Sequence, residues 1–565
     1  MMKIFVNQLG YLPNSKKIAI LSEPIQPGAP APFAPDTVQL CTKDGTCILE
    51  KTVTSFGPDE ASGDFVWQAD FSELTKPDTY VVKCGDCTSY PFAVGTDLYG
   101  TLTALLSKAL YFQRCGTELS AQFAGKFART DCHLQPSFLW TEYKKYLVGV
   151  LSENSLQKFD IYGGWHDAGD FGRYPTAASV ALAHILYAYR FFPEAFTEPL
   201  NIPESGNGMP DILNECLYEL RWMLQMQDAE GGIYHKQTTL RHADFIMPCD
   251  DKDPLLLFPV SSMAVADFAA IMALASRIYR PFDEAFAEQA LTAALKSYTW
   301  LERHPEFVPF TNPSECNTGE YGDSSDADER MWATMELYRC TGGEHYLAQA
   351  KNYFDAGTNP TEFGWADVGG FAGWALFEDE LRGDSEHNGS ALEQSFRVTY
   401  KEAILREANR LLTVIDSCGY GVALSPPDYI WGSNMVVLNR AMLLSTAYLL
   451  APKEAYRTGA VRQMDYLLGV NAVDYSYVTG VGTHAVCNPH NRVTEADGID
   501  ETIPGFVSGG PNGHPADELG AATIPAGTPP MKCFLDRWEC YSLNEITIYW
   551  NSPAIFAAAF LNCKQ

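Results

Sequence analysis

The chain has 565 residues, of which 46% are hydrophobic and 19% charged, and its net charge at pH 7 is −30. A chain of this length exceeds an ordinary single domain, so we expect several domains or one unusually large domain with an ample core. The negative charge excludes nucleic acid and anionic membranes as partners, because both would be repelled, whereas a neutral substrate is compatible with it and a cationic one is favoured. No run of about 18 apolar residues predicts a transmembrane span.

The start of the chain does not resemble a signal peptide. Residues 1–8 lack a basic segment followed by an apolar one and are typical of a β-strand. We therefore expect either a cytoplasmic protein or a secreted one whose signal precedes this numbering. The fifteen cysteines show no regular disulfide spacing, which favours a reducing compartment.

Residues 1–95 are predicted to form an all-β domain. Cys41, Cys47, Cys84 and Cys87 lie at two predicted hairpin tips, where a metal knuckle and two disulfides are alternatives that the sequence leaves open without favouring either. Short strand-like segments, separated by Gly, Pro or Asp turns, recur at the spacing of a β-sandwich. They cover residues 4–6, 17–21, 38–40, 47–49, 65–67 and 80–82.

Helical periodicity dominates from residue 96 to residue 565. In residues 211–227, for example, the apolar side chains fall largely on one helical face. Because long loops separate the helices and no strand alternation appears, we expect an all-α second domain. The predicted helices cover residues 101–112, 176–190, 211–227, 261–280, 284–303, 326–340, 392–412, 434–450, 456–468 and 545–561.

A glycine-rich stretch at residues 163–174 carries two carboxylates three residues apart, Asp167 and Asp170. Its glycines disfavour a long helix or strand and favour a tight loop, in which both carboxylates can converge on one small volume. Converging carboxylates serve either a cation or a water molecule that must lose a proton. The alternative is an exposed Asp-rich turn.

Near the other end of the chain, Glu545 interrupts an aromatic and apolar segment at residues 534–553. We expect this position to desolvate the carboxyl group in part, which raises its pKa. A carboxyl group with a raised pKa, facing carboxylates with a lowered one, is the arrangement that acid/base hydrolysis of glycosides requires.

These two stretches resemble glycoside hydrolase family 9, the cellulase family of inverting β-1,4-glucanases. The resemblance implies an (α/α)6 barrel and endo-cleavage of a β-1,4-glucan or cello-oligosaccharide. It implies Asp170 as general base, Asp167 as its helper in holding the water, and Glu545 as general acid. The fixed positions of the family's C-terminal signature are occupied here by Phe534, Asp536, Tyr541, Glu545, Thr547, Asn551 and Ser552.

Residues 6–13 resemble the start of the immunoglobulin-like module that precedes the catalytic domain in one branch of family 9. The expected architecture is therefore multidomain, with an all-β immunoglobulin-like sandwich at 1–95 and an all-α (α/α)6-barrel catalytic domain at 96–565. The expected role of the sandwich is to brace the catalytic domain.

His490 and Arg492 stand two residues apart in a loop, where both side chains can donate hydrogen bonds to sugar hydroxyls. An ordinary polar loop is the alternative. The resemblance implies that this pair holds the sugar on the non-reducing side of the cut bond, and we add Trp431 and Tyr541 as expected substrate contacts. His484 stands where the family usually has Asn, Lys or Arg.

Cys115, Cys132, His133 and His166 have the Cys2His2 composition of closed structural zinc sites. Their spacing is not that of a zinc finger, so from the residues alone four unrelated core positions are the favoured interpretation. The immunoglobulin-bearing branch of family 9 has a structural zinc whose ligands fall on these positions. The resemblance therefore implies a zinc ion that pins the Asp-bearing loop through His166.

Two acidic loops resemble calcium loops of the family, because they offer hard oxygen ligands in glycine-bent segments. Solvated acidic loops are the alternative for both, and Asn214 stands where the family often has Asp. The expected calcium ligands are Glu204, Asn207 and Asp211 in the first loop, and Thr318, Glu320, Asp323 and Asp367 in the second.

Three functions follow from these observations. The first is an inverting endo-β-1,4-glucanase. The second is an exo-acting member of the same family, either a cellodextrinase or a β-glucosaminidase, since the charge of −30 suits a cationic chitosan oligomer. The third is a non-catalytic sugar-binding protein, which the intact Asp167, Asp170 and Glu545 disfavour.

Overall fold

The computed structural model describes residues 2–26, 28, 32, 34–384 and 389–563. The chain forms two compact units. The first unit contains Met1–Leu106, Leu405–His490 and Asp500–Gln565, and the second contains Ser107–Ile404 and Asn491–Ile499. The predicted domain boundary at 95/96 lies within the first unit, between strand β9, which ends at Val94, and helix α1, which begins at Leu98.

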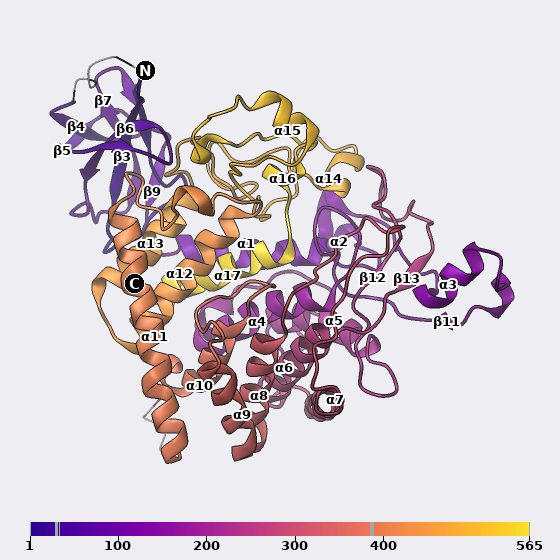
Figure 1. Cartoon of the computed structure of the whole chain (residues 1–565). Coiled ribbons are helices and arrows are strands. Elements are labelled where there is room, and N and C mark those ends of the chain that lie inside the picture. Colours follow the sequence, from indigo (N-terminus) through magenta and orange to yellow (C-terminus); the bar gives the residue numbers. More distant parts are fainter. Residues whose placement is uncertain (1, 27, 29–31, 33, 385–388, 564–565) are drawn as a thin grey trace. The chain divides into compact units, whose positions relative to one another are not determined.

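The N-terminal strands form the predicted β-sandwich (Figure 1). The long strand β5 joins its two sheets: residues 53–59 pair with β6 in the layer β1-β3-β6-β5, and residues 47–52 pair with β4 in the layer β5-β4-β7-β9-β2. A register shift between Ser55 and Gly57 marks the bend. The strands are β1 Lys3–Phe5, β2 Gly10–Tyr11, β3 Ile18–Pro24, β4 Thr37–Thr42, β5 Cys47–Asp59, β6 Asp64–Asp70, β7 Asp78–Cys84, β8 Cys87–Thr88 and β9 Phe92–Val94.

Buried polar contacts attach the sandwich to later segments of the same unit. Asn7 donates to Asp465 at 2.8 Å, and the Tyr420 hydroxyl donates to Asp64 at 2.9 Å, all within the buried interior. Removing one partner of a buried hydrogen bond leaves an unsatisfied polar group that costs about 1–3 kcal/mol. The sandwich is thus fixed to the C-terminal part of its unit, as a bracing role requires.

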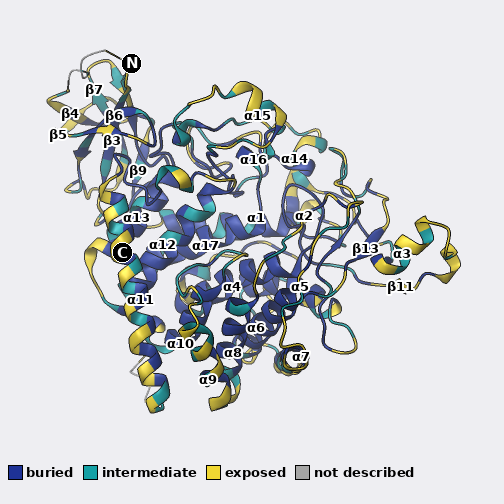
Figure 2. Cartoon of the chain, viewed as in Figure 1, coloured by how far each residue is buried: buried dark blue, intermediate teal, exposed yellow. Residues whose placement is uncertain are grey.

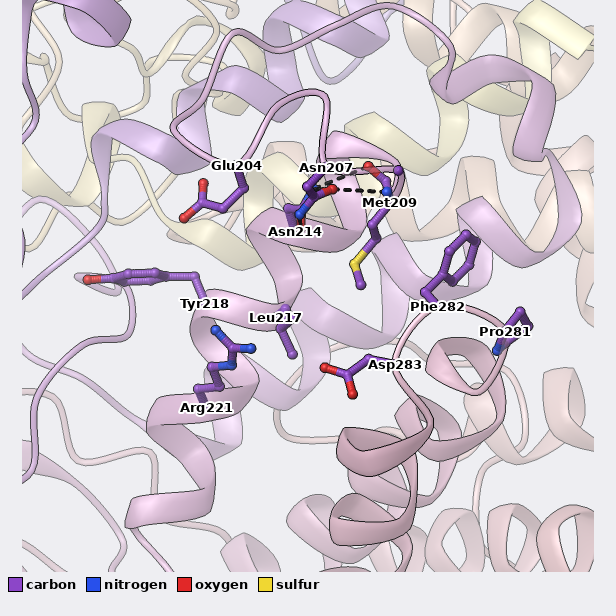
Figure 3. Close-up of a pocket in the computed structure, with 11 residues that line it drawn as sticks. Glu204, Asn207, Met209, Asn214, Leu217, Tyr218, Arg221, Pro281, Phe282 and Asp283 are labelled. Carbon is purple, nitrogen blue, oxygen red and sulfur yellow. Dashed lines mark hydrogen bonds between the residues drawn. The ribbon is translucent and has the colours of Figure 1, made fainter.

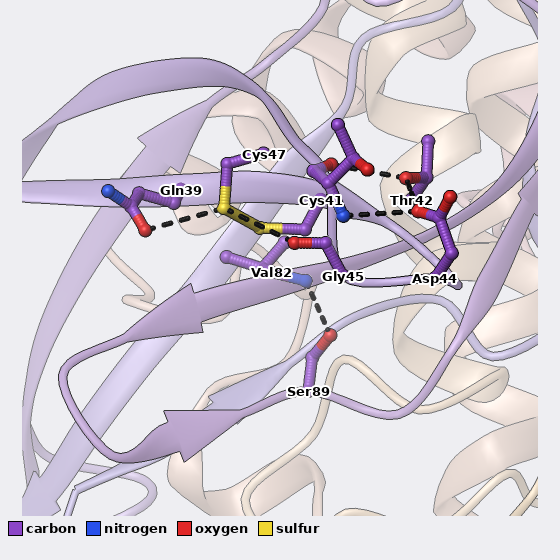
Figure 4. Close-up of a disulfide and its surroundings, with 9 residues drawn as sticks. Gln39, Cys41, Thr42, Asp44, Gly45, Cys47, Val82 and Ser89 are labelled. Atoms are coloured by element: carbon purple, nitrogen blue, oxygen red, sulfur yellow. Dashed lines mark hydrogen bonds between the residues drawn. A yellow bond between two sulfur atoms is a disulfide. The ribbon is translucent and has the colours of Figure 1, made fainter.

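The four cysteines of the sandwich form one disulfide, between Cys41 and Cys47, which closes the turn from β4 to β5 (Figure 4). Cys84 and Cys87 face each other across the β7–β8 turn as thiols. Cys84 lies three residues beyond Val81, the residue that pairs with Cys41. At about 3.3 Å per residue the two cysteine pairs are about 10 Å apart along the strands. The metal-knuckle alternative is therefore wrong, and so is the alternative of two disulfides, because only the Cys41–Cys47 pair is bonded among these four cysteines.

The remainder of the chain is largely helical, and the ten predicted helices are all present. The helices are α1 Leu98–Phe112, α2 Ala121–Ala124, α3 Trp140–Leu147, α4 Pro175–Phe191, α5 Asp211–Gln225, α6 Ser262–Tyr279, α7 Glu284–Arg303, α8 Ala327–Thr341, α9 Glu344–Asp355, α10 Gly369–Arg382, α11 Ala391–Asp416, α12 Ser433–Leu450, α13 Glu454–Leu467, α14 Arg492–Ala496, α15 Glu518–Thr523, α16 Tyr541–Asn544 and α17 Ile548–Cys563.

Burial separates these helices into an inner and an outer set (Figure 2). In the second unit, α4, α6 and α8 pack side by side and are buried almost all round, whereas α7 and α9 bury one face only. An all-round apolar helix belongs in a core and an amphipathic one on a surface. Contrary to expectation, α6 is long and apolar enough to cross a membrane by length and composition, and 94% of it is buried inside the fold as a core helix would be.

Seven of the seventeen α-helices in the described residues, and a small sheet, were not predicted; the two longest of these helices are α9 and α10. Helix α10 begins with Gly369 and Gly370, which read as loop residues in the sequence. A Cβ at Gly369 would lie 1.9 Å from the Asn359 carbonyl oxygen, so close packing requires glycine there. The neighbouring helix α9 was also missed. The sheet has the order β11-β10-β13-β12, from Lys158–Phe159, Ser137–Leu139, Leu255–Leu257 and Gln237–Thr238.

Candidate active site

The predicted loop at residues 163–174, called the Asp loop below, connects β11 to α4 in the second unit. Gly164 has φ +78°, and a Cβ there would lie 2.8 Å from the Trp222 ring, so only glycine allows this approach. The Gln113 side-chain amide donates to the carbonyl groups of His166 at 3.0 Å and Ala168 at 2.9 Å. The Asp loop is therefore a rigid element, not the exposed turn that was the alternative.

Both aspartates of the loop are buried, with 2% of Asp167 and 7% of Asp170 exposed. The Tyr321 hydroxyl donates to Asp167 Oδ2 at 2.5 Å, while Asp167 Oδ1 has no hydrogen-bond partner among the described residues. Burial raises the pKa of Asp167 well above its usual value, and the nearby Asp170 charge adds to this effect. Burial acts on Asp170 in the same direction, but His242 and Arg492 outweigh it and hold the pKa of Asp170 below its usual range.

The partners of these aspartates come from distant parts of the sequence and were not predicted. His242 Nδ1 lies 3.2 Å from Asp170 Oδ2, 72 positions away in the chain. Tyr321 is one of the few non-glycine residues with positive φ, at +46°. A lone His and a lone Tyr in polar loops carry no local signal of these contacts, so the sequence could not have assigned them.

A buried lysine ammonium holds the segment that ends at Tyr321. Lys236 Nζ donates to Asn312 Oδ1 at 2.7 Å, to Thr318 Oγ1 at 3.0 Å and to the Gly319 carbonyl at 2.7 Å. Burial lowers the pKa of Lys236 to about 8. Because Tyr321 follows this segment directly and donates to Asp167, the ammonium fixes the backbone from which that hydrogen bond is made.

In the first unit, Glu545 follows α16 and is half-buried between buried neighbours, as expected from its apolar segment. His490 donates from Nδ1 to the Trp538 carbonyl at 2.6 Å. The backbones of His490 and Glu545 form an isolated β-bridge. The Tyr541 ring lies 5.9 Å from the His490 ring and 5.2 Å from that of Trp431, which is 46% exposed. Within this unit the fold thus gathers the predicted acid and three of the four predicted sugar contacts.

Arg492 belongs to the second unit and has a different setting from the one expected. Its Nε donates to the Ala243 carbonyl at 2.7 Å and its Nη1 to the Gly169 carbonyl at 3.0 Å, and 6% of the residue is exposed. These bonds fix the Asp loop to the segment that carries His242. A contact from Arg492 to sugar stays a prediction.

Cys115, Cys132, His133 and His166 converge in the second unit, with one ligand atom from each lying within 4.8 Å of all the others. All four are buried, and His133 Nδ1 has no hydrogen-bond partner in the described chain, while its Nε2 faces Asp251 Oδ2 at 3.3 Å. The neighbouring Cys115 thiol and the two histidines hold the pKa of Cys132 well below its usual range. A thiolate, an imidazole nitrogen free to bind and a carboxylate behind that imidazole fit a tetrahedral metal site.

Two models of known protein families match this chain. A model of glycosyl hydrolase family 9 matches residues 99–558, and a model of the cellulase N-terminal ig-like domain matches residues 1–89. The chain belongs to glycosyl hydrolase family 9. Its predicted architecture, an immunoglobulin-like sandwich followed by an (α/α)6 barrel, is thereby confirmed.

Three relatives of this family 9 hydrolase cover almost all of it. A cellodextrinase from Butyrivibrio fibrisolvens is 38% identical, with 99% of both chains covered. The crystal structure of a single mutant thermostable endoglucanase from Alicyclobacillus acidocaldarius is 34% identical, with a TM-score of 0.88 and 99% of both chains covered. The Zn-binding triple mutant of the family 9 endoglucanase J30 is 30% identical, with a TM-score of 0.87, and the match covers 97% of this chain and 99% of that one.

The first predicted calcium loop has its oxygen atoms engaged by protein groups. The Glu204 carboxylate accepts two hydrogen bonds of 3.0 Å from Arg114, Asp211 accepts from the Ser205 hydroxyl at 2.6 Å, and Asn207 pairs with Asn214. Because the arginine already supplies the positive charge, these contacts do not favour calcium there.

In the second predicted loop, Thr318 is bound by Lys236, and Glu320 accepts from the Asn312 backbone at 2.8 Å. Asp323 accepts from the Ser324 backbone, and Asp367 from Asn359 at 2.8 Å. Asp367 differs from the others, because burial and the charge of Asp328 raise its pKa to about 7. Next to Asp328 in the chain, Glu329 is fully buried and neither of its carboxylate oxygens has a hydrogen-bond partner in the described residues.

Proposed function

We propose that this hydrolase is an endo-β-1,4-glucanase that acts on cellulose-type glucans and cello-oligosaccharides with inversion. The observation that carries the proposal is the difference between the two buried aspartates of the Asp loop. Asp170 is held ionised, as a general base must be, and Asp167 presents one oxygen that no described group engages. A water molecule that loses its proton to Asp170 needs such a second acceptor to hold it.

In the proposed reaction, Asp170 removes a proton from that water, the water attacks the anomeric carbon, and Glu545 protonates the leaving glycosidic oxygen. Inverting hydrolases keep the two carboxyl groups about 6.5–9.5 Å apart, which leaves room for the water. His490, Tyr541 and Trp431 support this role for Glu545, because they would bind sugar beside it. Arg492 would act by fixing the Asp loop and by a hydrogen bond to sugar.

A zinc ion is proposed for the cluster of Cys115, Cys132, His133 and His166. Four protein ligands complete a tetrahedron, so the ion would stabilise the fold without binding water or joining the chemistry. His166 directly precedes Asp167, and the ion would therefore help to fix the Asp loop. For calcium, we propose the second predicted loop rather than the first, because the charge of Asp328 acts on Asp367 there and no arginine pairs with Asp367 among the described residues. We also propose that the sandwich ends at residue 95 and that the catalytic domain begins at residue 96.

The second candidate is exo-action on short cellodextrins, which the cellodextrinase among the relatives favours. The viscosity of carboxymethyl-cellulose, followed together with reducing sugar, separates the two modes. An endo-enzyme lowers the viscosity well before much sugar appears, whereas sugar release without that drop supports exo-action. The same assay on chitosan oligomers tests the glucosaminidase alternative.

The mechanism is tested on the same substrates. Asp170→Ala should abolish hydrolysis and leave binding of cello-oligosaccharides intact, and early products from β linkages should have the α configuration. More than a few per cent of residual activity, or β products, would refute the assignment of base or of stereochemistry respectively.

A further inference from the structure

A pocket of about 410 Å³ lies beside α5 in the second unit, and none of the residues of the proposed reaction lines it (Figure 3). One helical face of α5, through Asn214, Leu217, Tyr218 and Arg221, forms part of its wall. Pro281, Phe282 and Asp283, in the turn between α6 and α7, form another part. Ligand pockets in proteins usually measure about 300–1,000 Å³, so the space suits a small organic molecule.

Two charged groups in this wall, Arg221 and Asp283, form no ion pair among the described residues. In Figure 3 the Arg221 guanidinium and the Asp283 carboxylate both point into the pocket. Neither forms an ion pair within the described residues, although Asp283 Oδ1 accepts the backbone N–H of Phe286 as the N-cap of α7. An arginine offers a fork of donors, and a carboxylate offers only acceptors. Together they match neighbouring hydroxyl groups, each of which can donate one hydrogen bond and accept another.

The apolar part of the wall completes this pattern. Phe282 is one of the few large hydrophobic residues with substantial exposure, at 38%. Leu217 and Met209 also line the pocket (Figure 3). A pyranose ring has an apolar C–H face and a rim of hydroxyl groups, which suits an aromatic face beside hydrogen-bonding groups.

The charges of the pocket wall favour a neutral ligand. Glu204 is paired with Arg114 through two hydrogen bonds of 3.0 Å. The wall groups that form no ion pair among the described residues are then one guanidinium, on Arg221, and one carboxylate, on Asp283, so their charges balance. We propose that this pocket is a second carbohydrate site, which binds a neutral mono- or disaccharide of the size released by glucan hydrolysis. The choice of glucose and cellobiose as ligands rests on the proposed function.

Side-chain contacts connect helix α5, which forms part of the pocket wall, with the Asp loop. The adjoining face of α5 carries Glu215, which accepts a hydrogen bond from Trp165 Nε1 at 2.9 Å. Tyr218, in the wall of the pocket, donates through its hydroxyl to the Cys115 carbonyl at 2.5 Å. A sugar that orders α5 therefore lies two side-chain contacts away from both the Asp loop and the metal cluster.

Equilibrium dialysis with labelled cellobiose and glucose, in an Asp170→Asn background that cannot consume the sugar, tests the proposal. Loss of one charge-assisted hydrogen bond weakens binding by about ten- to a hundred-fold. At concentrations that just saturate the background, Arg221→Ala should therefore bind one sugar molecule fewer per chain. Phe282→Ala should do the same, because it removes the aromatic face on which the sugar ring would pack. Both residues are exposed, so both variants are expected to fold.

Arg280→Ala is the matched control, because Arg280 is exposed near the pocket and does not line it. It should bind as many molecules as the background. Unchanged stoichiometry and affinity in both Arg221→Ala and Phe282→Ala would overturn the second site. In the catalytically intact chain, Arg280→Ala should hydrolyse cello-oligosaccharides at the wild-type rate, because Arg280 lines neither the pocket nor the proposed active site. If the intact chain hydrolyses no glucan, the proposed function fails, while the dialysis result still decides whether the pocket binds sugar.

Discussion

Replacing Lys236 by methionine tests how the Tyr321 segment is held. The change removes the ammonium donor from three oxygen acceptors, on the buried Thr318 and on the half-buried Asn312 and Gly319. Thr318 keeps the Thr238 hydroxyl as a partner at 2.9 Å, and each of the other two acceptors costs about 1–3 kcal/mol when it is unsatisfied. Against this, the pKa of Lys236 is lowered from 10.5 to about 8, so removing its buried charge returns about 3 kcal/mol. We expect Lys236→Met to lower the free energy of unfolding by about 1 kcal/mol at pH 7.

The pH dependence of this loss distinguishes the buried charge from simple packing. Between the folded pKa of about 8 and the unfolded value of 10.5, the unfolded wild-type chain binds more protons than the folded one, so its stability rises with pH. The variant lacks this gain, and the difference in stability should widen by up to about 3 kcal/mol from pH 8 to pH 10.5.

Urea unfolding at pH 7 and pH 10 measures both quantities, with Lys145→Met as a control at an exposed lysine. If the free energies of unfolding of wild type and Lys236→Met differ by the same amount at both pH values, Lys236 is not a buried ammonium with a lowered pKa. The rate of hydrolysis provides a second readout, because Tyr321 donates to Asp167 from the segment that Lys236 holds. kcat should fall more than KM rises.

Three further predictions concern the site itself. His242→Gln removes a group that lowers the pKa of Asp170, so the acidic limb of the kcat/KM profile should move up by about 1–3 pH units; an unmoved limb would show that His242 does not tune the base. Glu545→Gln should lose activity on cello-oligosaccharides but keep part of it on aryl glycosides whose leaving group needs no proton, and equal losses on both would indicate a structural role. Cys132→Ser should reduce bound zinc below the one ion per chain expected for the wild type and lower the melting temperature, because metal binding is coupled to folding; unchanged zinc content and melting temperature would remove Cys132 from the ligand set.

Local patterns in the sequence were sufficient to predict the β-sandwich, ten of the helices and the family. Short strand-like segments between turn residues predicted the sandwich, and helical periodicity predicted ten helices. Both patterns can be recognised because each lies within a few consecutive residues. The same holds for the Asp loop and for the segment around Glu545. Helix α10 was not predicted because Gly369 and Gly370 are typical of a loop. In the structure these glycines allow the start of the helix to pack closely against residues 359–363.

Tertiary structure alone decided which groups act on these residues. His242 contacts Asp170, which is 72 positions away in the chain. Lys236 binds Thr318, 82 positions away, and Arg114 binds Glu204, 90 positions away. Such contacts depend on how helices and loops pack, and no spacing in the chain encodes them. They also explain why the first calcium prediction found no support: the sequence shows that a carboxylate is present, but only the fold shows that an arginine supplies its counter-charge, because electrostatic partners are chosen by distance in space and not by distance along the chain.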